Sequence, residues 1–513
     1  MKREFSSLKN THFDLLVCGG GIYGAWTAYD AALRGLKVAL IEQDDWASAT
    51  SSASSKLIHG GLRYLESFDF KLVQKALNER GQLLKAAPHR VWPLRFGVPV
   101  YEDSRISRLQ LKAGLTIYDV LAHGPDAQMR HRYLDSNAFG RQFSALTQDG
   151  LKGGFTYADA QTDDARLVLE LVAGAMEAGA VCVNQSKLIS VNETNGEASG
   201  ASIQDRLSGE VHDVQASVLV NASGQWLTSN PVSRDWCRLS KGVHLILPAM
   251  LEGEALLLTA KSDGRVFFVI PWYGRTLLGT TDTDYRGDIE HVTVEKADVD
   301  YLLNEVNHYL NTPCTEQDVI GSYAGVRVMR QSDAASPSAV SRDWELQTEP
   351  NGVLYSVGGK ITSAREDAAV IVDAVCRKLN VQLRCCTKNR LFPWTPEDFT
   401  TWSASVVEQA NKLGIDEECC GWLIRRHGKR AKSILRDVAE NPSLAKRIVA
   451  ELPFIYADLV FCAREEMVVH KDDLLRRRMP LLILAKLTED EQRQIMEVVA
   501  KANLMSNSRE KLI

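Results

Sequence analysis

Short apolar runs alternate with a helical stretch of small residues at the start of the chain. Residues 13–18 (FDLLVC) have the length and composition of a buried strand, and residues 37–41 form a second apolar run. Between them, residues 25–33 follow a helical pattern that ends at Arg34-Gly35. The pattern predicts a βαβ unit, in which two parallel strands are joined by a crossover helix.

Further along, strand and helix patterns continue to alternate. Thr162-Asp163-Asp164 predicts the N-terminal cap of an amphipathic helix that ends near Gly179. A β-meander with a turn at Asn195-Gly196 is expected over 185–216, and the stretch 262–284 is also rich in strand-forming residues. Beyond about residue 385, helical patterns and charge pairs dominate, which indicates a domain boundary.

Composition and charge narrow the class of protein. The chain has 513 residues, 45% hydrophobic and 24% charged, which suits about two to four globular domains. Its net charge of −5 argues against a general nucleic-acid binder, because binding phosphates requires a basic excess. No apolar run reaches the roughly 18 to 20 residues of a membrane span, and the N-terminus lacks a signal-peptide core. We therefore expect a soluble, intracellular protein.

Metal-binding motifs are not expected in this sequence. None of the ten cysteines forms a Cys-x-x-Cys pair, and no His-Glu-x-x-His motif occurs. Scattered cysteines without ligand spacing are typical of reduced, partly buried thiols in an intracellular protein. We predict no metal site.

A glycine motif follows the first predicted strand. Gly19, Gly21 and Gly24 form Gly-x-Gly-x-x-Gly at the strand-to-helix turn, and Glu42 closes the second strand. In a dinucleotide-binding fold these glycines allow a tight turn, close approach of a pyrophosphate, and close helix–strand packing, while the acid accepts hydrogen bonds from a ribose. The alternative is a glycine-rich turn in an ordinary βαβ unit. The position between strand and helix favours the dinucleotide site.

A longer motif identifies a family resemblance. Residues 50–66 (TSSASSKLIHGGLRYLE) closely resemble the signature of FAD-dependent glycerol-3-phosphate dehydrogenases, within the D-amino acid oxidase-like flavoproteins. The likeness covers nearly the whole chain and extends through 163–167 (DDARL), 268–272 (FVIPW), 279–282 (GTTD), 325–327 (GVR) and 358–362 (GGKIT). The resemblance implies FAD as the cofactor.

The predicted architecture is α/β, or α+β overall, with a Rossmann-like FAD-binding domain, a β-rich substrate domain and a C-terminal helical domain. Residues 1–384 are expected to form the flavoprotein region, and 385–513 the helical domain. Within the first region we assign about 1–85, 152–235 and 316–384 to FAD binding, and about 86–151 and 236–315 to substrate binding.

The resemblance also names residues that would hold the flavin. A hydroxyl-rich loop with two glycines can contact pyrophosphate and flavin through backbone amides, and a late Gly-Gly before a helix can stabilise the charge of a reduced flavin. A simple turn is the alternative for the late pair. The expected cofactor-binding residues are Gly19, Gly21, Gly24, Glu42, Thr50, Ser51, Ser52, Gly60, Gly61, Gly224, Gly358, Gly359 and Thr362.

The substrate implied by the resemblance is glycerol 3-phosphate, oxidised at C2 to dihydroxyacetone phosphate. Arg63 and Arg327 match the cations that would hold the phosphate, with Lys360 near substrate and flavin and Tyr64 shaping the pocket. His244 matches the histidine that would accept the hydroxyl proton as hydride passes from C2 to flavin N5. Surface ion pairs and a hydrogen-bonded core histidine are the alternatives.

Neighbouring residues leave some questions open. His59 is a second candidate base, which we expect instead to support the flavin loop. Tyr23 stands where the family pattern has Asn, and the residues at 328–330 and 363–364 also depart from it, so the exact substrate stays open. A related FAD oxidase of another hydroxy or amino acid, or a non-catalytic redox-sensing flavoprotein, would fit the same fold.

The resemblance further implies a peripheral membrane enzyme that passes electrons to ubiquinone, at the inner face of the bacterial cytoplasmic membrane. Residues 421–480 carry 13 basic and 8 acidic residues, and basic clusters at 425–430 and 476–478 adjoin apolar residues. Such a surface suits anionic headgroups, although a solvated helical face is the alternative. A homodimer is compatible with the sequence.

Overall fold

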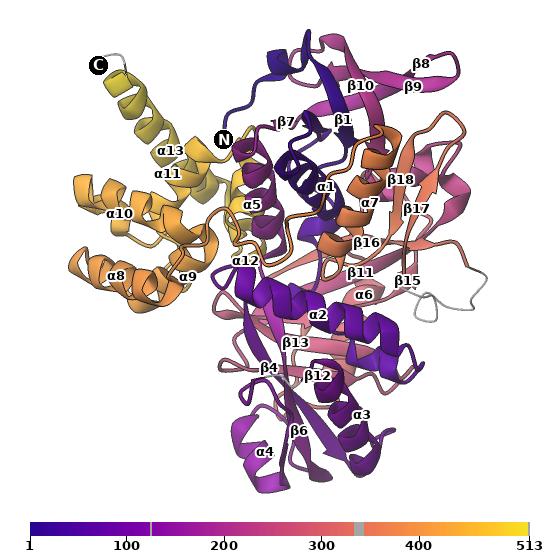
Figure 1. The fold of residues 1–513 in the computed structure, drawn as a ribbon. Helices are drawn as coiled ribbons and strands as arrows, with labels where there is room; N and C mark the ends of the chain where they lie inside the picture. The colour runs from indigo at the N-terminus through magenta and orange to yellow at the C-terminus, as the bar shows by residue number, and fades with distance from the viewer. Residues whose placement is uncertain (124–125, 333–342, 511–513) are drawn as a thin grey trace.

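Two β-sheets with helices packed on them form the larger part of the molecule, and the last helices lie together at one side (Figure 1). The computed structural model describes residues 1–123, 126–332 and 343–510, with side chains of the last helix described to residue 502. Both sheets are assembled from segments far apart in sequence.

The first sheet is the predicted dinucleotide-binding sheet. Its strand order is β17-β18-β10-β1-β2-β7, with β8 and β9 added as an antiparallel meander on β10. β1 lies parallel to both β2 and β10, which gives the crossover geometry expected from the apolar runs. The strands are β1 (His12–Cys18), β2 (Val38–Ile41), β7 (Val181–Val183), β8 (Ser186–Thr194), β9 (Glu197–Asp205), β10 (Val211–Asn221), β17 (Trp344–Thr348) and β18 (Leu354–Gly358).

The second sheet has the order β15-β11-β14-β13-β12-β4-β6-β3, with β16 paired to β11 and β5 to β6. Its strands are β3 (Leu57–Ile58), β4 (Val91–Tyr101), β5 (Arg132–Leu134), β6 (Leu151–Thr162), β11 (Cys237–Pro248), β12 (Ala255–Thr259), β13 (Val266–Trp272), β14 (Arg275–Gly279), β15 (Thr283–Asp284) and β16 (Gly321–Arg330). This pairing places β6 and β16 in the substrate sheet, whereas the ranges 152–235 and 316–384 assigned them to FAD binding. Long antiparallel pairing with β4 and β11 holds them there.

Helices with small apolar residues cover the first sheet. Ala25, Ala28 and Ala31 of α1 are fully buried, which lets this helix pack closely against its neighbours α5 and α7. The Asp163 side chain caps α5 by accepting a hydrogen bond from the Arg166 N–H, as the sequence predicts. The helices are α1 (Ile22–Leu33), α5 (Asp164–Glu177) and α7 (Ala364–Lys378).

Four further helices border the second sheet: α2 (Phe70–Ala86), α3 (Arg108–Leu121), α4 (Ser136–Gln142) and α6 (Lys296–Asn307). α3 packs on α2 and on the short helix at Leu62–Leu65, which lies in the signature loop. In Figure 1 it lies at the lower end of the molecule, away from the C-terminal helices.

The first four C-terminal helices share an apolar core of their own, whereas the last two pack into the core of the second sheet. The C-terminal helices are α8 (Phe399–Lys412), α9 (Glu417–His427), α10 (Ala431–Glu440), α11 (Tyr456–Glu465), α12 (Leu481–Leu484) and α13 (Glu489–Glu510). Phe392 and Trp394 belong to the core of the first sheet, so the helical unit begins just after them. Among the described helices, none is both long and apolar enough to cross a bilayer.

Each of the two basic clusters in the C-terminal segment contains a buried, paired arginine. The Arg426 side chain is buried and bonds Asp458, while the Arg478 guanidinium lies 2.7 Å from both carboxylate oxygens of the buried Asp45. The apolar turn after this second cluster is buried too. A buried guanidinium is stable only when it is paired, so Arg426 joins α9 to α11, and Arg478 joins the C-terminal segment to the loop after β2.

Candidate active site

A cavity of about 880 Å³ is lined by residues of both sheets. One part is lined by the β1–α1 turn, Glu42 and β8, and another by the signature loop, β13, β16 and the loop after β18. A volume of this size is at the upper end of the range for ligand sites in proteins. The cavity therefore has room for a large cofactor and a small substrate together.

The glycine motif leaves no room for side chains at the turn between β1 and α1. A Cβ atom on Gly19 would lie 2.5 Å from the Ala222 carbonyl oxygen, and one on Gly24 would lie 1.8 Å from the Gly19 carbonyl oxygen. Gly19 also has a φ of +111°, which L side chains rarely adopt. The N-terminus of α1 can therefore open directly onto the cavity, where its dipole favours a phosphate.

Glu42 lies at the end of β2, buried beside this turn. Its carboxylate accepts hydrogen bonds from the Gly20 N–H at 2.6 Å and the Asp44 N–H at 2.9 Å. Burial raises the pKa of Glu42 to about 7, although the two amide donors favour the charged form. The carboxylate lines the cavity, in the place where a ribose hydroxyl would meet it.

Hydroxyl groups of the signature loop form hydrogen bonds with β16 of the second sheet and with α1. Thr50 Oγ1 donates to the Val326 carbonyl at 2.6 Å, and Ser51 Oγ accepts from the Ile22 N–H at 2.9 Å. Ser51 thereby joins the loop to the first turn of α1. These contacts position the loop along the cavity.

The structure brings most of the predicted cofactor residues to the cavity wall: Gly19, Gly21, Glu42, Thr50, Ser51, Gly61, Gly224, Gly358 and Gly359. Four others lie behind it and act through packing or loop contacts. Gly24 packs on Gly19, and Gly60 leaves room for the Leu77 and Tyr118 side chains. Ser52 Oγ donates to the Ala49 carbonyl, and Thr362 Oγ1 accepts from the His59 N–H.

The loop after β18 brings a second glycine pair to the cavity. Gly358 and Gly359 have φ values of +77° and +101°, and a Cβ on Gly359 would collide with the Tyr23 hydroxyl at 1.8 Å. That hydroxyl accepts the Lys360 N–H at 3.0 Å and donates to Asp367 at 2.8 Å. Tyr23, the residue that departs from the family pattern, thus joins the first glycine turn to the last.

Four cationic side chains line one part of the cavity: Arg63, Arg265, Arg327 and Lys360. Lys360 Nζ lies 3.9 Å from the centre of the Tyr64 ring. Arg327 donates to Thr280 Oγ1 at 2.6 Å and to the Thr281 carbonyl at 3.1 Å, which fixes its guanidinium. A cluster of this kind suits a phosphorylated substrate.

Arg265 was missed by the sequence reasoning. It stands just before β13, three residues ahead of the Phe-Val-Ile-Pro-Trp motif, and donates to the Asp282 carbonyl at 2.6 Å. An arginine near a motif shared with the family was the available signal, but a charged residue at the start of a strand is usually solvated.

Of the two candidate histidines, His59 lines the cavity and His244, the expected base, lies behind the cavity wall. His59 lines the cavity, and burial lowers its pKa to about 4. His244, on β11, is 1% exposed and is not among the described residues that line the cavity. Its Nε2 lies 2.8 Å from the Ser55 hydroxyl oxygen, and Ser55 does line the cavity. His244 therefore reaches the cavity through Ser55.

The residues present fit FAD. At one part of the cavity lie the first glycine turn, where no side chain has room, the N-terminus of α1 and the buried Glu42 carboxylate. At another part lies the second glycine turn, which precedes α7. The first set suits the pyrophosphate and ribose, and the second suits the polar edge of an isoalloxazine.

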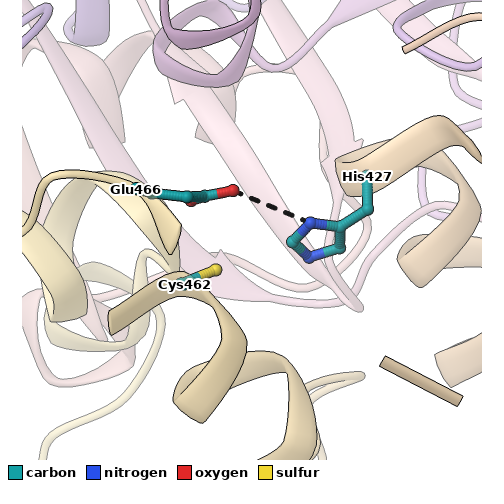
Figure 2. Close-up of side chains that lie close together, drawn as sticks. All are labelled: His427, Cys462 and Glu466. Carbon is teal, nitrogen blue, oxygen red and sulfur yellow. Dashed lines mark ion pairs between the residues drawn. The ribbon is translucent and has the colours of Figure 1, made fainter. Parts of the chain in front are cut away.

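His427, Cys462 and Glu466 also lie close together, between α9 and α11 (Figure 2). Donor atoms of these residues lie within 4.8 Å of one another, as in some metal sites. The Arg166 guanidinium, however, bonds Glu466 and lies 3.3 Å from His427 Nδ1 and 3.9 Å from Cys462 Sγ. Since this guanidinium already contacts all three residues, we assign the cluster to the domain interface.

Comparison with known proteins gives one family for the whole chain. Residues 14–365 match the FAD dependent oxidoreductase family, and residues 393–510 match the C-terminal domain of alpha-glycerophosphate oxidase. The chain is 36% identical to a glycerol-3-phosphate dehydrogenase of Synechocystis over 93% of this chain and 90% of that protein. It is 32% identical to an aerobic glycerol-3-phosphate dehydrogenase of Staphylococcus saprophyticus, over 93% and 89%.

Solved structures agree with these matches. The glycerol-3-phosphate dehydrogenase of Bacillus halodurans in complex with FAD superposes with a TM-score of 0.76 at 28% identity, covering 97% of this chain and 96% of that one. An FAD-bound L-alpha-glycerophosphate oxidase of Mycoplasma pneumoniae, at 17% identity, has a TM-score of 0.56 over 75% of this chain and its own full length. The second likeness concerns the fold alone.

Proposed function

Because this chain belongs to the glycerol-3-phosphate dehydrogenase family of FAD-dependent oxidoreductases, we propose that it oxidises sn-glycerol 3-phosphate to dihydroxyacetone phosphate. The observation that carries the proposal is the set of four cations on the wall of the cavity that fits FAD. A plain hydroxy acid or amino acid needs one cation for its carboxylate, whereas a phosphate dianion is best held by several.

Each residue has a role that follows from its place. Arg327 is held by Thr280 and Thr281 with its guanidinium at the cavity, so it can pair with phosphate oxygens without first becoming ordered. Arg63 and Lys360 add charge on the neighbouring wall. FAD, when bound, would supply the hydride acceptor for C2, and the residues of the cavity would orient C2 and remove the hydroxyl proton.

Anaerobic mixing with substrate tests the proposal. We expect the visible absorbance of the bound flavin to bleach with glycerol 3-phosphate, and to bleach far more slowly with glycerol, lactate or glycine. Bleaching by one of the unphosphorylated compounds, with none by glycerol 3-phosphate, would refute the substrate. Flavin that no compound in the panel reduces would support a non-catalytic role.

We propose that ubiquinone in the bilayer accepts the electrons of the reduced flavin, with the enzyme bound at the inner face of the bacterial cytoplasmic membrane. The support is an apolar face on α3, next to the short helix that carries Arg63 and Tyr64. A quinone dissolved in lipid can approach the site only if the protein rests on that lipid close to the site. Reduced enzyme should be reoxidised by a short-chain ubiquinone much faster than by oxygen; rapid formation of peroxide in air would favour an oxidase.

The α3 face has the features of a bilayer contact. Leu109, Ile117 and Val120 are exposed at helical spacing on α3, and Phe68 follows the short helix beside it. Leu109, Val120 and Phe68 are 74%, 69% and 76% exposed, the largest values among the large apolar side chains whose exposure is described. The exposed Lys71, Lys112 and Arg108 provide positive charge around them, while Arg105 pairs with Glu66. Such a surface suits anionic headgroups better than the buried C-terminal arginines do.

Vesicle sedimentation tests this face. Wild-type protein should sediment with vesicles that contain phosphatidylglycerol and much less with phosphatidylcholine alone. The double substitution Leu109→Glu and Val120→Glu should abolish sedimentation without loss of flavin, while Val370→Glu, at a 44% exposed site on α7, should not. Equal sedimentation of both variants would exclude α3 as the contact.

A further inference from the structure

Ser55 stands between the cavity and the buried histidine. Its hydroxyl oxygen lies 2.8 Å from His244 Nε2, and Ser55 is part of the cavity wall. The other ring nitrogen, Nδ1, is buried without a hydrogen-bond partner among the described residues. The hydroxyl of Ser55 is thus the one polar contact of the imidazole that the described residues provide, and it belongs to a residue of the cavity wall.

The imidazole is held in one orientation. It stacks on the Tyr323 ring, with centroids 4.9 Å apart and planes 20° apart. On β14, Gly279 lies opposite, where a Cβ would come within 2.3 Å of the His244 ring. Tyr323 is fixed in turn by donating its hydroxyl to the Ser54 carbonyl at 2.7 Å. A ring fixed this firmly, with one polar neighbour, has the geometry of a preorganised proton acceptor.

We propose that the Ser55 hydroxyl relays the C2 hydroxyl proton of the substrate to His244, and that the substrate's own phosphate, by pairing with Arg327, permits this transfer. The inference rests on the proposed oxidation of glycerol 3-phosphate. It adds a catalytic residue, Ser55, and makes the phosphate group a participant in the chemistry.

The step is balanced in protons and electrons. The O–H bond at C2 breaks and its proton passes to Ser55 Oγ, while the Ser55 O–H bond breaks and that proton passes to His244 Nε2. The carbonyl π bond forms as the hydrogen on C2 leaves with its electron pair to FAD, the oxidant named above. The substrate loses two electrons, and the imidazole becomes an imidazolium.

The charges around His244 explain why phosphate is needed. Two cations act on the ring: Arg327 on β16, which pairs with the Asp282 carboxylate at 3.3 Å, and Lys56 in the signature loop, which pairs with Asp164 at 2.6 Å. Tyr323 on β16 is uncharged, because burial raises its pKa well above 10, and the β14 neighbour is a glycine. Burial and the two cations lower the pKa of His244 well below 6.5. A phosphate dianion paired with Arg327 adds two negative charges to the single one of Asp282, which offsets the larger of the two unfavourable charges and allows His244 to hold a proton.

Removal of the Ser55 hydroxyl tests the relay. Ser55→Ala should lower the rate constant of flavin reduction by about 100-fold or more, with little change in substrate affinity, since positioned proton transfer typically contributes that much. The residual rate should rise with pH as hydroxide replaces the relay, and Ser55→Thr should restore activity. Ser54→Ala removes a neighbouring cavity hydroxyl that bonds Asp164 and not His244, so it is the matched control.

The role of the phosphate is tested by dividing the substrate into two separate molecules, glycerol and phosphite dianion. Phosphite should accelerate flavin reduction by glycerol at least tenfold, and the effect should vanish in Arg327→Ala. In ¹⁵N NMR spectra of the oxidised protein, assigned with His244→Gln, phosphite should raise the pKa of His244. Phosphite that binds without either effect, or that fails to bind, would overturn the role of the phosphate.

The outcomes separate this inference from the proposed function. If glycerol 3-phosphate does not reduce the wild-type flavin, the substrate is wrong. If it reduces wild type and Ser55→Ala at the same rate, the relay alone is wrong. A normal Ser55→Ala rate, combined with a large loss in His59→Gln, would assign the proton to His59.

Discussion

Substitution of Gly24 by alanine tests whether the first glycine turn holds the cofactor. The added Cβ would lie 1.8 Å from the Gly19 carbonyl oxygen, whereas a close carbon–oxygen contact is about 3.3 Å. The N-terminus of α1 must therefore move by about 1.5 Å or the strand must distort. Overpacking of this kind costs about 1 to 3 kcal/mol. If the turn relaxes in the free protein and FAD binding restores its original conformation, the affinity for FAD falls by about 5-fold to 150-fold.

The assay compares flavin content and thermal stability with a control in the same chain. Gly81 lies within α2 and has nothing within 4 Å of its hypothetical Cβ, so Gly81→Ala should stabilise the helix by about 0.5 to 1 kcal/mol. Gly24→Ala should lose visible absorbance on dialysis and regain stability only with excess FAD. A Gly24→Ala protein that keeps its flavin and melts like wild type would refute the packing argument.

Three further predictions concern the substrate end and the buried charges. Arg327→Ala should raise the KM for glycerol 3-phosphate by well over tenfold in a dye-linked assay, because losing a charged partner costs about 2 to 5 kcal/mol; an unchanged KM would contradict the phosphate site. Asp458→Asn leaves Arg426 buried without its carboxylate and should cost about 3 to 5 kcal/mol in denaturant unfolding, whereas Asp437→Asn, at an exposed ion pair, should cost under 1. Burial lowers the pKa of His427 to about 4, so the unfolded chain binds an extra proton between pH 6.5 and 4, and the melting temperature should fall across that range. His427→Gln should have a shallower dependence, and an equal slope would mean that other groups dominate.

Local patterns predicted the parts of the fold that are determined by neighbours in sequence. The apolar runs around Gly19 became β1 and β2, and Asn195-Gly196 became the turn between β8 and β9. These features depend on strand length, turn chemistry and capping, which act over a few residues. The signature loop was likewise identified from its own residues, and it lines the cavity.

The basic segment shows what such patterns cannot predict. A run of arginines contributes the same net charge whether its side chains meet solvent, lipid or buried carboxylates. Arg478 pairs with Asp45 across 433 residues of sequence, and Arg166 pairs with Glu466 across 300. Because such partners are brought together only by the tertiary fold, charge counting could not tell a solvated face from a lipid surface or a buried domain interface.

The position of His244 is a second case, and it bears on function. In a strand, successive side chains point to opposite faces, so a residue's type does not tell whether it meets a cavity directly or through a neighbour. Here the sheet places His244 behind Ser55 and opposite Gly279, with two cations nearby. A base at the cavity surface would be available to any alcohol that enters. A base that is buried among cations and reached through a serine accepts a proton only when an anion neutralises part of the positive charge. The burial of His244, which the sequence does not reveal, would therefore make the reaction selective for a phosphorylated substrate.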